Sequence, residues 1–410
     1  MHAPRPAGSR RTFWAAACVL GLALWSSGAP SALYPHYAQR WDLTPFLVTA
    51  VFATYQLTLI VVLPLFGGLS DRFGRRIVLI AAVLLIAASG VLFATAPHVS
   101  ALFAGRVLQG AGTGLGMGAG TAALLDNRGT RTPLFASSTA TVSTATGLTA
   151  ALVISGVVAE YLPLPTVWGF VVLVVLALAA AVLLVSTPDD RPASGPRWRP
   201  QRPELPQGLA LVFWLATMSL SLAYCAGAIF LAMGAQMISA FAITDSTLVV
   251  GLLLGSSTAV IGLTGVLIAG VPAIVSIGIG TALTLASMGL MAGVAEAGTA
   301  SLFLVFSVIG GMAYAFGFAG GLGLLGAVVP PDSSGAILST LYLVAYVLQA
   351  VAALGTGALA TAYGMRAGII LAASVMCLLC VLVAVLLVVH LRRDHRLRRT
   401  PLLPSAAGPG

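Results

Sequence analysis

The sequence has very little charge for its length. Only 8% of its 410 residues are charged, whereas an ordinary soluble domain carries about 25%. Lysine is absent, so all 20 basic residues are arginines, and 59% of the chain is hydrophobic. A soluble protein could not cover its surface with so few charges. The composition therefore excludes a cytosolic enzyme, a disordered chain and a disulfide scaffold, and it predicts an integral membrane protein.

Residues that bind metals or cofactors are also scarce. The four cysteines lie in apolar runs, and the CxxC pair Cys377 and Cys380 has no histidine or charged neighbour, so we expect no metal or redox site. The sequence has no phosphate-binding loop and no nucleophile–base pair, which argues against direct use of ATP, a cofactor or an enzymatic activity. The net charge of +9 is typical of the cytoplasmic side of a membrane protein, so we expect no nucleic-acid partner.

Apolar runs long enough to span a membrane occur twelve times along the chain. They are much longer than barrel strands and do not alternate between polar and apolar residues. The sequence therefore predicts an all-α membrane protein with twelve transmembrane helices. Their approximate limits are 13–33, 46–68, 77–96, 100–124, 134–158, 165–185, 208–232, 247–268, 271–293, 299–326, 335–361 and 367–390.

The arginine positions predict the orientation of these helices. With the N-terminus inside, the outer loops hold only Arg40 and Arg366, and Arg106 lies within a span. All the others fall in cytoplasmic segments, a bias that places both termini in the cytoplasm of a multi-pass plasma-membrane protein. The cytoplasmic arginines are Arg5, Arg10, Arg11, Arg72, Arg75, Arg76, Arg128, Arg131, Arg191, Arg197, Arg199, Arg202, Arg392, Arg393, Arg396, Arg398 and Arg399.

The predicted spans form two blocks of six, separated by a segment rich in proline and charge. That segment is typical of a cytoplasmic linker. Equal halves suggest duplication, as in transporters built from repeats. We expect a monomer in the lipid bilayer with an N-terminal six-helix bundle (1–185), a linker (186–207), a C-terminal six-helix bundle (208–391) and a cytoplasmic tail (392–410).

The strongest motif lies between the second and third spans. A short loop there needs glycine to reverse the chain and arginine to stay inside, and a plain hairpin would explain that much. It would not explain the order Gly-x-Leu-x-Asp-Arg-x-Gly-Arg-Arg, which closely resembles the loop signature of the major facilitator superfamily. The matching residues are Gly67, Leu69, Asp71, Arg72, Gly74, Arg75 and Arg76.

The resemblance, together with the twelve spans in two halves, implies a secondary active transporter that works by alternating access. Asp71 and the start of the eleventh span, which follows Pro330 and Pro331, are both predicted on the cytoplasmic face. Because a helix N-terminus carries partial positive charge, our hypothesis is that Asp71 meets the start of that helix when the inner gate is closed. The family's behaviour suggests the same contact.

A second motif, Arg106, Gln109 and Gly110, resembles the family's fourth-helix signature. An intramembrane charge is costly and indicates function, although an arginine that snorkels to the membrane surface or bonds to nearby carbonyls is the alternative. Gln109 shares a helix face with Arg106, and Gly110 permits close helix contact. In proton-driven relatives this arginine is linked to proton coupling, which is an implication of the resemblance. A Gly-Pro pair typical of related antiporters in the fifth helix is replaced here by Ala151 and Leu152, which weakens the antiporter interpretation.

Polar and aromatic residues at mid-span depth are candidates for a central substrate cavity. In the eleventh span Tyr342, Tyr346 and Gln349 recur at helical spacing on one face. For each aromatic residue, simple packing between helices is the alternative interpretation. The candidates are Trp25, Tyr34, Tyr55, Gln56, Tyr224, Gln236, Tyr314, Tyr342, Tyr346 and Gln349.

No Asp or Glu lies deep in any predicted span, so Arg106 is the fixed charge of the membrane interior. This favours a neutral or anionic small molecule as the substrate over a cation, and if protons are coupled, Glu160 or Asp42 would have to serve. The leading function is export of a drug or metabolite. The alternatives are an uptake permease for a nutrient such as an organic acid or sugar, and a membrane sensor that does not transport.

Overall fold

The computed structural model describes residues 9–66, 68–189, 209–329 and 334–399. Gly67 and most of the predicted linker, residues 190–207, therefore lie outside the described residues. Within them the chain is helical and contains no strand, which confirms the predicted all-α class. The N-terminal half contains α1 (Arg10–Gly28), η1 (Ser31–Leu33), α2 (Tyr34–Trp41), α3 (Pro45–Phe66), α4 (Leu69–Phe73), α5 (Arg75–Ala94), α6 (Val99–Asp126), α7 (Pro133–Tyr161) and α8 (Pro165–Val185).

The C-terminal half repeats the same plan of six long helices. They are α9 (Ala210–Ala240), α10 (Thr247–Leu267), α11 (Ala273–Ala297), α12 (Ala300–Gly326), α13 (Ser334–Tyr363) and α14 (Met365–Arg399).

Eleven segments of the described chain are long and apolar enough to cross a membrane. The twelfth predicted span is α6, which has 28 residues and packs against α1, α3 and α5. Arg106, Gln109 and several glycines lower its hydropathy, because these residues gain little from transfer into hydrocarbon. Helix α6 is nonetheless part of the twelve-helix arrangement predicted from the sequence.

Several helices extend beyond the apolar runs that predict them. Helix α9 continues to Ala240, eight residues past the predicted limit of 232, and buries Gln236. Helix α14 continues to Arg399, into the segment assigned to the tail. A helix satisfies its own backbone hydrogen bonds in lipid and water alike, so hydropathy alone does not mark its end.

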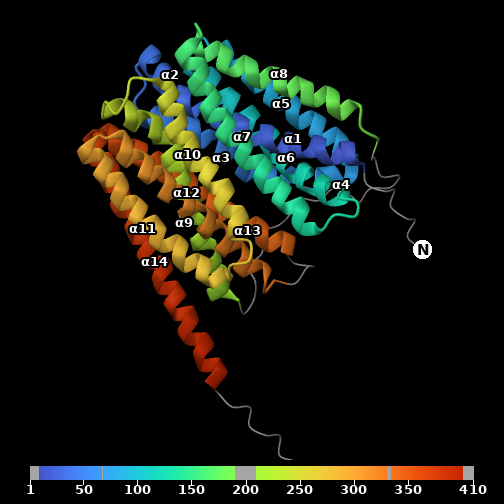
Figure 1. Ribbon diagram of the computed structural model, residues 1–410, viewed down its shortest axis with the longest axis vertical. Coiled ribbons are helices and arrows are strands. Elements are labelled where there is room, and N and C mark those ends of the chain that lie inside the picture. Colours follow the sequence, from blue (N-terminus) through green and yellow to red (C-terminus); the bar gives the residue numbers. More distant parts are fainter. Residues whose placement is uncertain (1–8, 67, 190–208, 330–333, 400–410) are drawn as a thin grey trace, which may run out of the picture.

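Figure 1 shows the two halves as separate bundles that meet along a shared face, with α14 projecting beyond the rest. The closest packing between the halves pairs α7 with α10 and α3 with α13. Within the first half, α6 approaches α3 closely at Gly110 and Gly114, and it approaches α5 closely at Gly112. Such small residues let helix backbones approach closely where hydrophobic burial provides no driving force.

The connectivity gives the bundle two ends. The start of α1 and the short helix α4 lie at one end, which we call the α4 end. Helix α2, the start of α3 and the end of α7 lie at the other, which we call the α2 end. The ends are distinct in character, because the loop motif lies at the α4 end and the contacts between the halves described below lie at the α2 end or at mid-depth.

Candidate functional site

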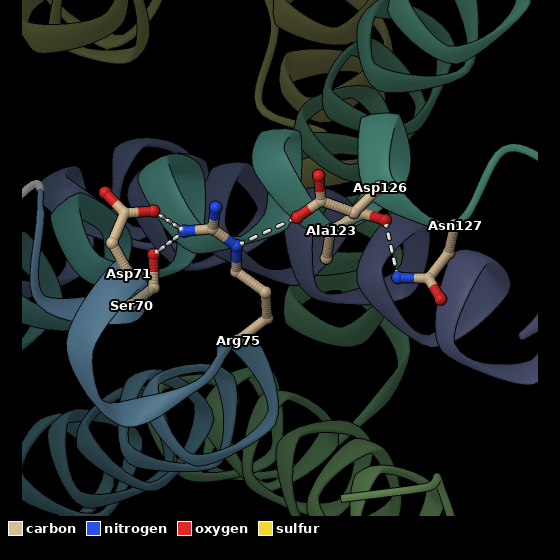
Figure 2. Close-up of polar contacts among 6 residues, drawn as sticks. All are labelled: Ser70, Asp71, Arg75, Ala123, Asp126 and Asn127. Atoms are coloured by element: carbon tan, nitrogen blue, oxygen red, sulfur yellow. Dashed lines mark hydrogen bonds and ion pairs between the residues drawn. The ribbon is translucent and has the colours of Figure 1, made fainter. Parts of the chain in front are cut away.

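The loop motif builds a compact ionic cluster around Arg75 at the α4 end. Figure 2 shows the guanidinium of Arg75 between two carboxylates, Asp71 of α4 and Asp126 at the end of α6. The ion-pair distances are 2.6 Å from Nη1 to Asp71 and 3.2 Å from Nε to Asp126, and Arg75 also donates to the Ser70 hydroxyl. The motif thus ties α4 and α5 to α6 within the N-terminal half.

Other motif residues shape this hairpin. Gly74 has φ +90°, a left-handed conformation that favours glycine, and it separates α4 from α5. Arg76 donates from Nε to the carbonyl of Leu184, so it caps the end of α8. Arg72 lies over the ring of Phe73. Asp71 binds within its own hairpin here, and residues 330–333 before α13 lie outside the described residues, so the gate contact stays a prediction.

Arg106 is fully buried inside the N-terminal half, with no exposed surface. Its Nη1 donates to the carbonyl of Ser27, 3.1 Å away, and to Oε1 of Gln109, 3.0 Å away. Its Nη2 donates to the hydroxyl of Tyr34. The predicted pairing with Gln109 on one helix face is therefore present, and the arginine does not extend toward the membrane surface.

Four aromatic rings surround the Arg106 guanidinium. The ring centres of Tyr34 and Phe52 lie 5.6 and 5.7 Å from its central carbon, and those of Tyr55 and Phe93 each lie 5.9 Å away. Such contacts stabilise a desolvated cation by about 2 kcal/mol. Sequence reasoning missed Phe52 and Phe93; the spacing of Phe52 three residues before Tyr55, on one helix face, was the available signal.

A second aromatic cluster lies in the C-terminal half. Tyr224 of α9 stacks with Tyr314 and Phe318 of α12, at ring-centre distances of 6.1 and 6.2 Å, and contacts Tyr346 of α13 at 5.2 Å. Tyr342 adjoins Tyr346 at 6.4 Å. We call these five residues the tyrosine cluster. The sequence identified all four tyrosines but missed Phe318, which follows Tyr314 by one helical turn.

Tyr55 lies on α3, the helix that packs across the halves against α13, which carries Tyr342 and Tyr346. The ring of Tyr55 faces Arg106. The structure thus brings six of the ten cavity candidates into two aromatic clusters, one in each half.

The remaining cavity candidates are less connected. The amide of Gln56 bonds to backbone carbonyls of its own helix, and Gln236 donates to the carbonyl of Ala232 one turn before it. Both are buried and satisfied locally, so the structure does not bring them to the aromatic region through hydrogen bonds. Trp25 packs in the hydrophobic core, and the buried Oε1 of Gln349 has no partner among the described residues.

Hydrogen bonds join the two halves at the α2 end. One Glu160 oxygen at the end of α7 accepts from Ser246, Thr247 and Leu248, the residues that begin α10. On the other side of the interface, the backbone N–H at the start of α3 donates over 3.0 Å to the hydroxyl of Thr361 in α13. The sequence placed Glu160 near this end but did not predict its partners, because nothing local indicates which helix lies opposite.

Backbone contact between α7 and α10 accompanies these bonds. A methyl group at Gly156 would lie 3.0 Å from the Cα of Gly251, and one at Gly251 would lie 2.6 Å from the Leu152 carbonyl oxygen. Farther along, the hydroxyls of Thr149 and Thr258 lie 2.8 Å apart. The two halves therefore touch backbone to backbone near the α2 end.

Sequence comparison gives one extended match. The profile of the Major Facilitator Superfamily matches residues 16–277. Two relatives come from Bacillus subtilis (strain 168): an arabinose-proton symporter, 38% identical over 18% of this chain, and a bacillibactin exporter, 35% identical over 19% of it. These matches cover 16% and 21% of the two relatives' own lengths.

Solved structures match the fold over nearly the whole chain. A bacterial homologue of the human lysosomal transporter Spinster, in an inward-facing and unoccupied conformation, gives a TM-score of 0.74 at 13% identity, covering 93% of this chain and 97% of that one. A mutant of the nucleoside transporter NupG gives a TM-score of 0.73 at 11% identity, covering 92% and 99%. At such identities the likeness shows the shared architecture.

Proposed function

Because this chain belongs to the major facilitator superfamily of transporters, we propose that it exports a small neutral or anionic organic molecule across the cell membrane. The observation that carries the proposal is the pair of aromatic clusters, one around the buried Arg106 and one in the other half, on helices such as α3 and α13 that pack across the interface. A site between two bundles is where alternating access requires the substrate to bind.

The chemistry of this region selects the substrate class. Its tyrosine rings offer flat apolar surface with hydroxyl groups at the edge, which suits an amphiphilic molecule with an aromatic or polyhydroxylated part. Its fixed charge is a cation, and Arg106 forms no ion pair with a carboxylate within the described chain. A cationic substrate would meet repulsion there, whereas a neutral or anionic one would not.

The gating proposal assigns opposite roles to the two ends. We place the α4 end, with its arginines, in the cytoplasm, following the charge bias of the sequence. The bonds of Glu160 and the glycine contact hold the α2 end together in this conformation. Asp71 would bind the start of α13 only when the α4 end closes, which is compatible with its pairing to Arg75 here.

Export is the leading direction, and the bacillibactin exporter among the relatives supports it. Uptake is the second candidate, since another relative is a sugar symporter and the Gly-Pro pair of related antiporters is replaced by Ala151 and Leu152. Efflux and uptake assays in cells that express the chain separate the two directions. Protons are the proposed coupling ion, and the chain acts as a monomer.

The decisive experiment measures flux in proteoliposomes with an imposed pH gradient, using a panel of neutral, anionic and cationic compounds. We expect transport of neutral or anionic members that depends on the gradient. The variant Arg106→Ala should abolish flux or uncouple it from the gradient. Normal coupled transport by that variant would refute the role of Arg106, and binding without any flux would favour a sensor.

A further inference from the structure

We propose that Arg106, Gln109 and Tyr34 form an occluded binding site for a singly charged anion, either a carboxylate or a halide. The proposal rests on the proposed transport function at one point: a carboxylate of the transported substrate is one source of such an anion. Three independent features of the site support it: its charge, its count of hydrogen-bond donors and its position behind Tyr55.

The first feature is an uncompensated charge. Arg106 has no exposed surface, and no carboxylate of the described chain pairs with it. Its partners are a backbone carbonyl, an amide oxygen and a hydroxyl, all of them neutral. Removing an arginine from water without a counter-charge is strongly unfavourable, and the aromatic rings offset only part of that cost.

The second feature is a surplus of donors. A guanidinium has five N–H groups and a glutamine amide has two more. The Nε of Arg106 and the Nε2 of Gln109 are both buried and have no acceptor among the described residues. Buried donors are normally paired. An anion would accept hydrogen bonds from these donors and also neutralise the charge of Arg106, whereas a water molecule would only accept the hydrogen bonds.

The third feature is a route to the site. Tyr55 is on α3, with its ring 5.9 Å from the Arg106 carbon, and α3 packs against α13 of the other half. Movement between the halves therefore also changes the surroundings of Tyr55. Arg106 is closed off in this conformation, so we infer that the anion enters and leaves as the halves move.

The first test measures the thermal stability of the purified full chain in detergent. Sodium benzoate is compared with its neutral isostere benzamide, and sodium chloride with sodium gluconate at equal ionic strength, since the hydroxyl-rich gluconate is far harder to desolvate than benzoate or chloride. A ligand that binds the folded state raises Tm by about 2 °C or more when saturating. A response to benzoate alone indicates a substrate carboxylate, and a response to chloride as well indicates a general anion site. No response to either overturns the proposal.

The second test supplies the anion covalently. Gln109→Glu places a carboxylate where the amide oxygen now lies, 3.0 Å from Nη1 of Arg106. We expect its Tm to exceed that of the wild type in gluconate and its response to benzoate to disappear. The matched control is Gln56→Glu, a glutamine that is equally buried and bonded to its own helix, which should lower Tm. If Gln109→Glu lowers Tm as much as the control does, the proposal is wrong.

These results are separable from the transport assay. An anion-dependent Tm shift in a protein that shows no flux supports the anion site and refutes the transport proposal. Flux of the predicted substrates without any anion-dependent shift in the wild type refutes the anion site and leaves the transport proposal standing.

Discussion

The carboxylate of Glu160, at the end of α7, accepts a 2.7 Å hydrogen bond from the backbone N–H of Thr247, the first residue of α10. The same oxygen accepts from the Thr247 hydroxyl and from the next backbone N–H. A carboxylate from one half therefore caps a helix of the other half, where the helix dipole favours negative charge. These bonds must break whenever the α2 end opens.

We first predict that Glu160→Gln shifts the protein toward opening at the α2 end, because it removes the charge that the helix N-terminus stabilises. Thr49, buried beside Gly357 at this interface, serves as a reporter when changed to cysteine after the native cysteines are replaced. Its labelling by an impermeant maleimide should rise roughly threefold. The control is Glu296→Gln, whose carboxylate pairs with Arg366 within the C-terminal half; equal labelling in both variants would contradict the assignment.

The second prediction concerns the opposite end. Asp71→Asn should bias the protein toward opening at the α4 end, because the proposed contact with the start of α13 depends on a negative charge. Accessibility of single cysteines from the two sides of the membrane measures the bias. Asp126→Asn is the matched control, since Asp126 also pairs with Arg75 but is not proposed to contact the start of α13. Unchanged accessibility in Asp71→Asn would exclude the gate contact.

The third prediction concerns helix packing. Gly110→Ala places a methyl group 2.6 Å from the Thr58 Cβ and 2.9 Å from the Tyr55 carbonyl oxygen, so it should destabilise the fold by about 1–3 kcal/mol. Gly289→Ala, on α11, meets nothing within 4 Å and should be neutral or stabilising, because alanine has the higher helix propensity. Thermal unfolding in detergent gives the comparison. A Gly110→Ala variant as stable as the wild type would show that α3 and α6 can separate freely.

The fourth prediction concerns substrate binding. Tyr224→Ala removes the ring that contacts Tyr314, Phe318 and Tyr346. A substrate that stacks on this ring loses about 0.5–1.5 kcal/mol of binding energy, so the KM for transport should rise by up to about tenfold. Tyr363→Ala, at an exposed position, should leave KM unchanged. Initial rates in proteoliposomes give KM, and Tm shows whether the variant is folded. A folded Tyr224→Ala protein with the KM of the wild type would place the substrate elsewhere.

The sequence predicts the number of helices and the two halves because both depend on composition. Twenty apolar residues span hydrocarbon wherever they occur, and a charged, proline-rich segment interrupts them. The sequence does not predict the break after Gly28, where Pro30 interrupts the first helix before α2. A proline in a long apolar run can also lie within a continuous helix, as Pro64 does in α3.

The site is predicted only in part, for a related reason. Arg106 and the tyrosines stand out from the sequence because they are unusual in apolar helices. Their partners do not stand out, because Phe52 and Phe93 look like any other apolar residue of a membrane helix until the helices are packed. The same holds for Glu160, whose partner helix begins 87 residues later at Thr247. Contacts across a fold depend on which faces meet, and that information is not local.

We infer that, while the α2 end stays closed, the glycine contact between α7 and α10 serves as the pivot for movement at the α4 end. Gly156 and Gly251 meet near one end of their helices, and α7 extends from there back to Pro133. At 1.5 Å per residue this gives a lever arm of about 35 Å. A rotation of about 10° at the pivot carries the far end of α7 through about 6 Å, so a slight rolling of two backbones becomes a displacement as wide as a small molecule.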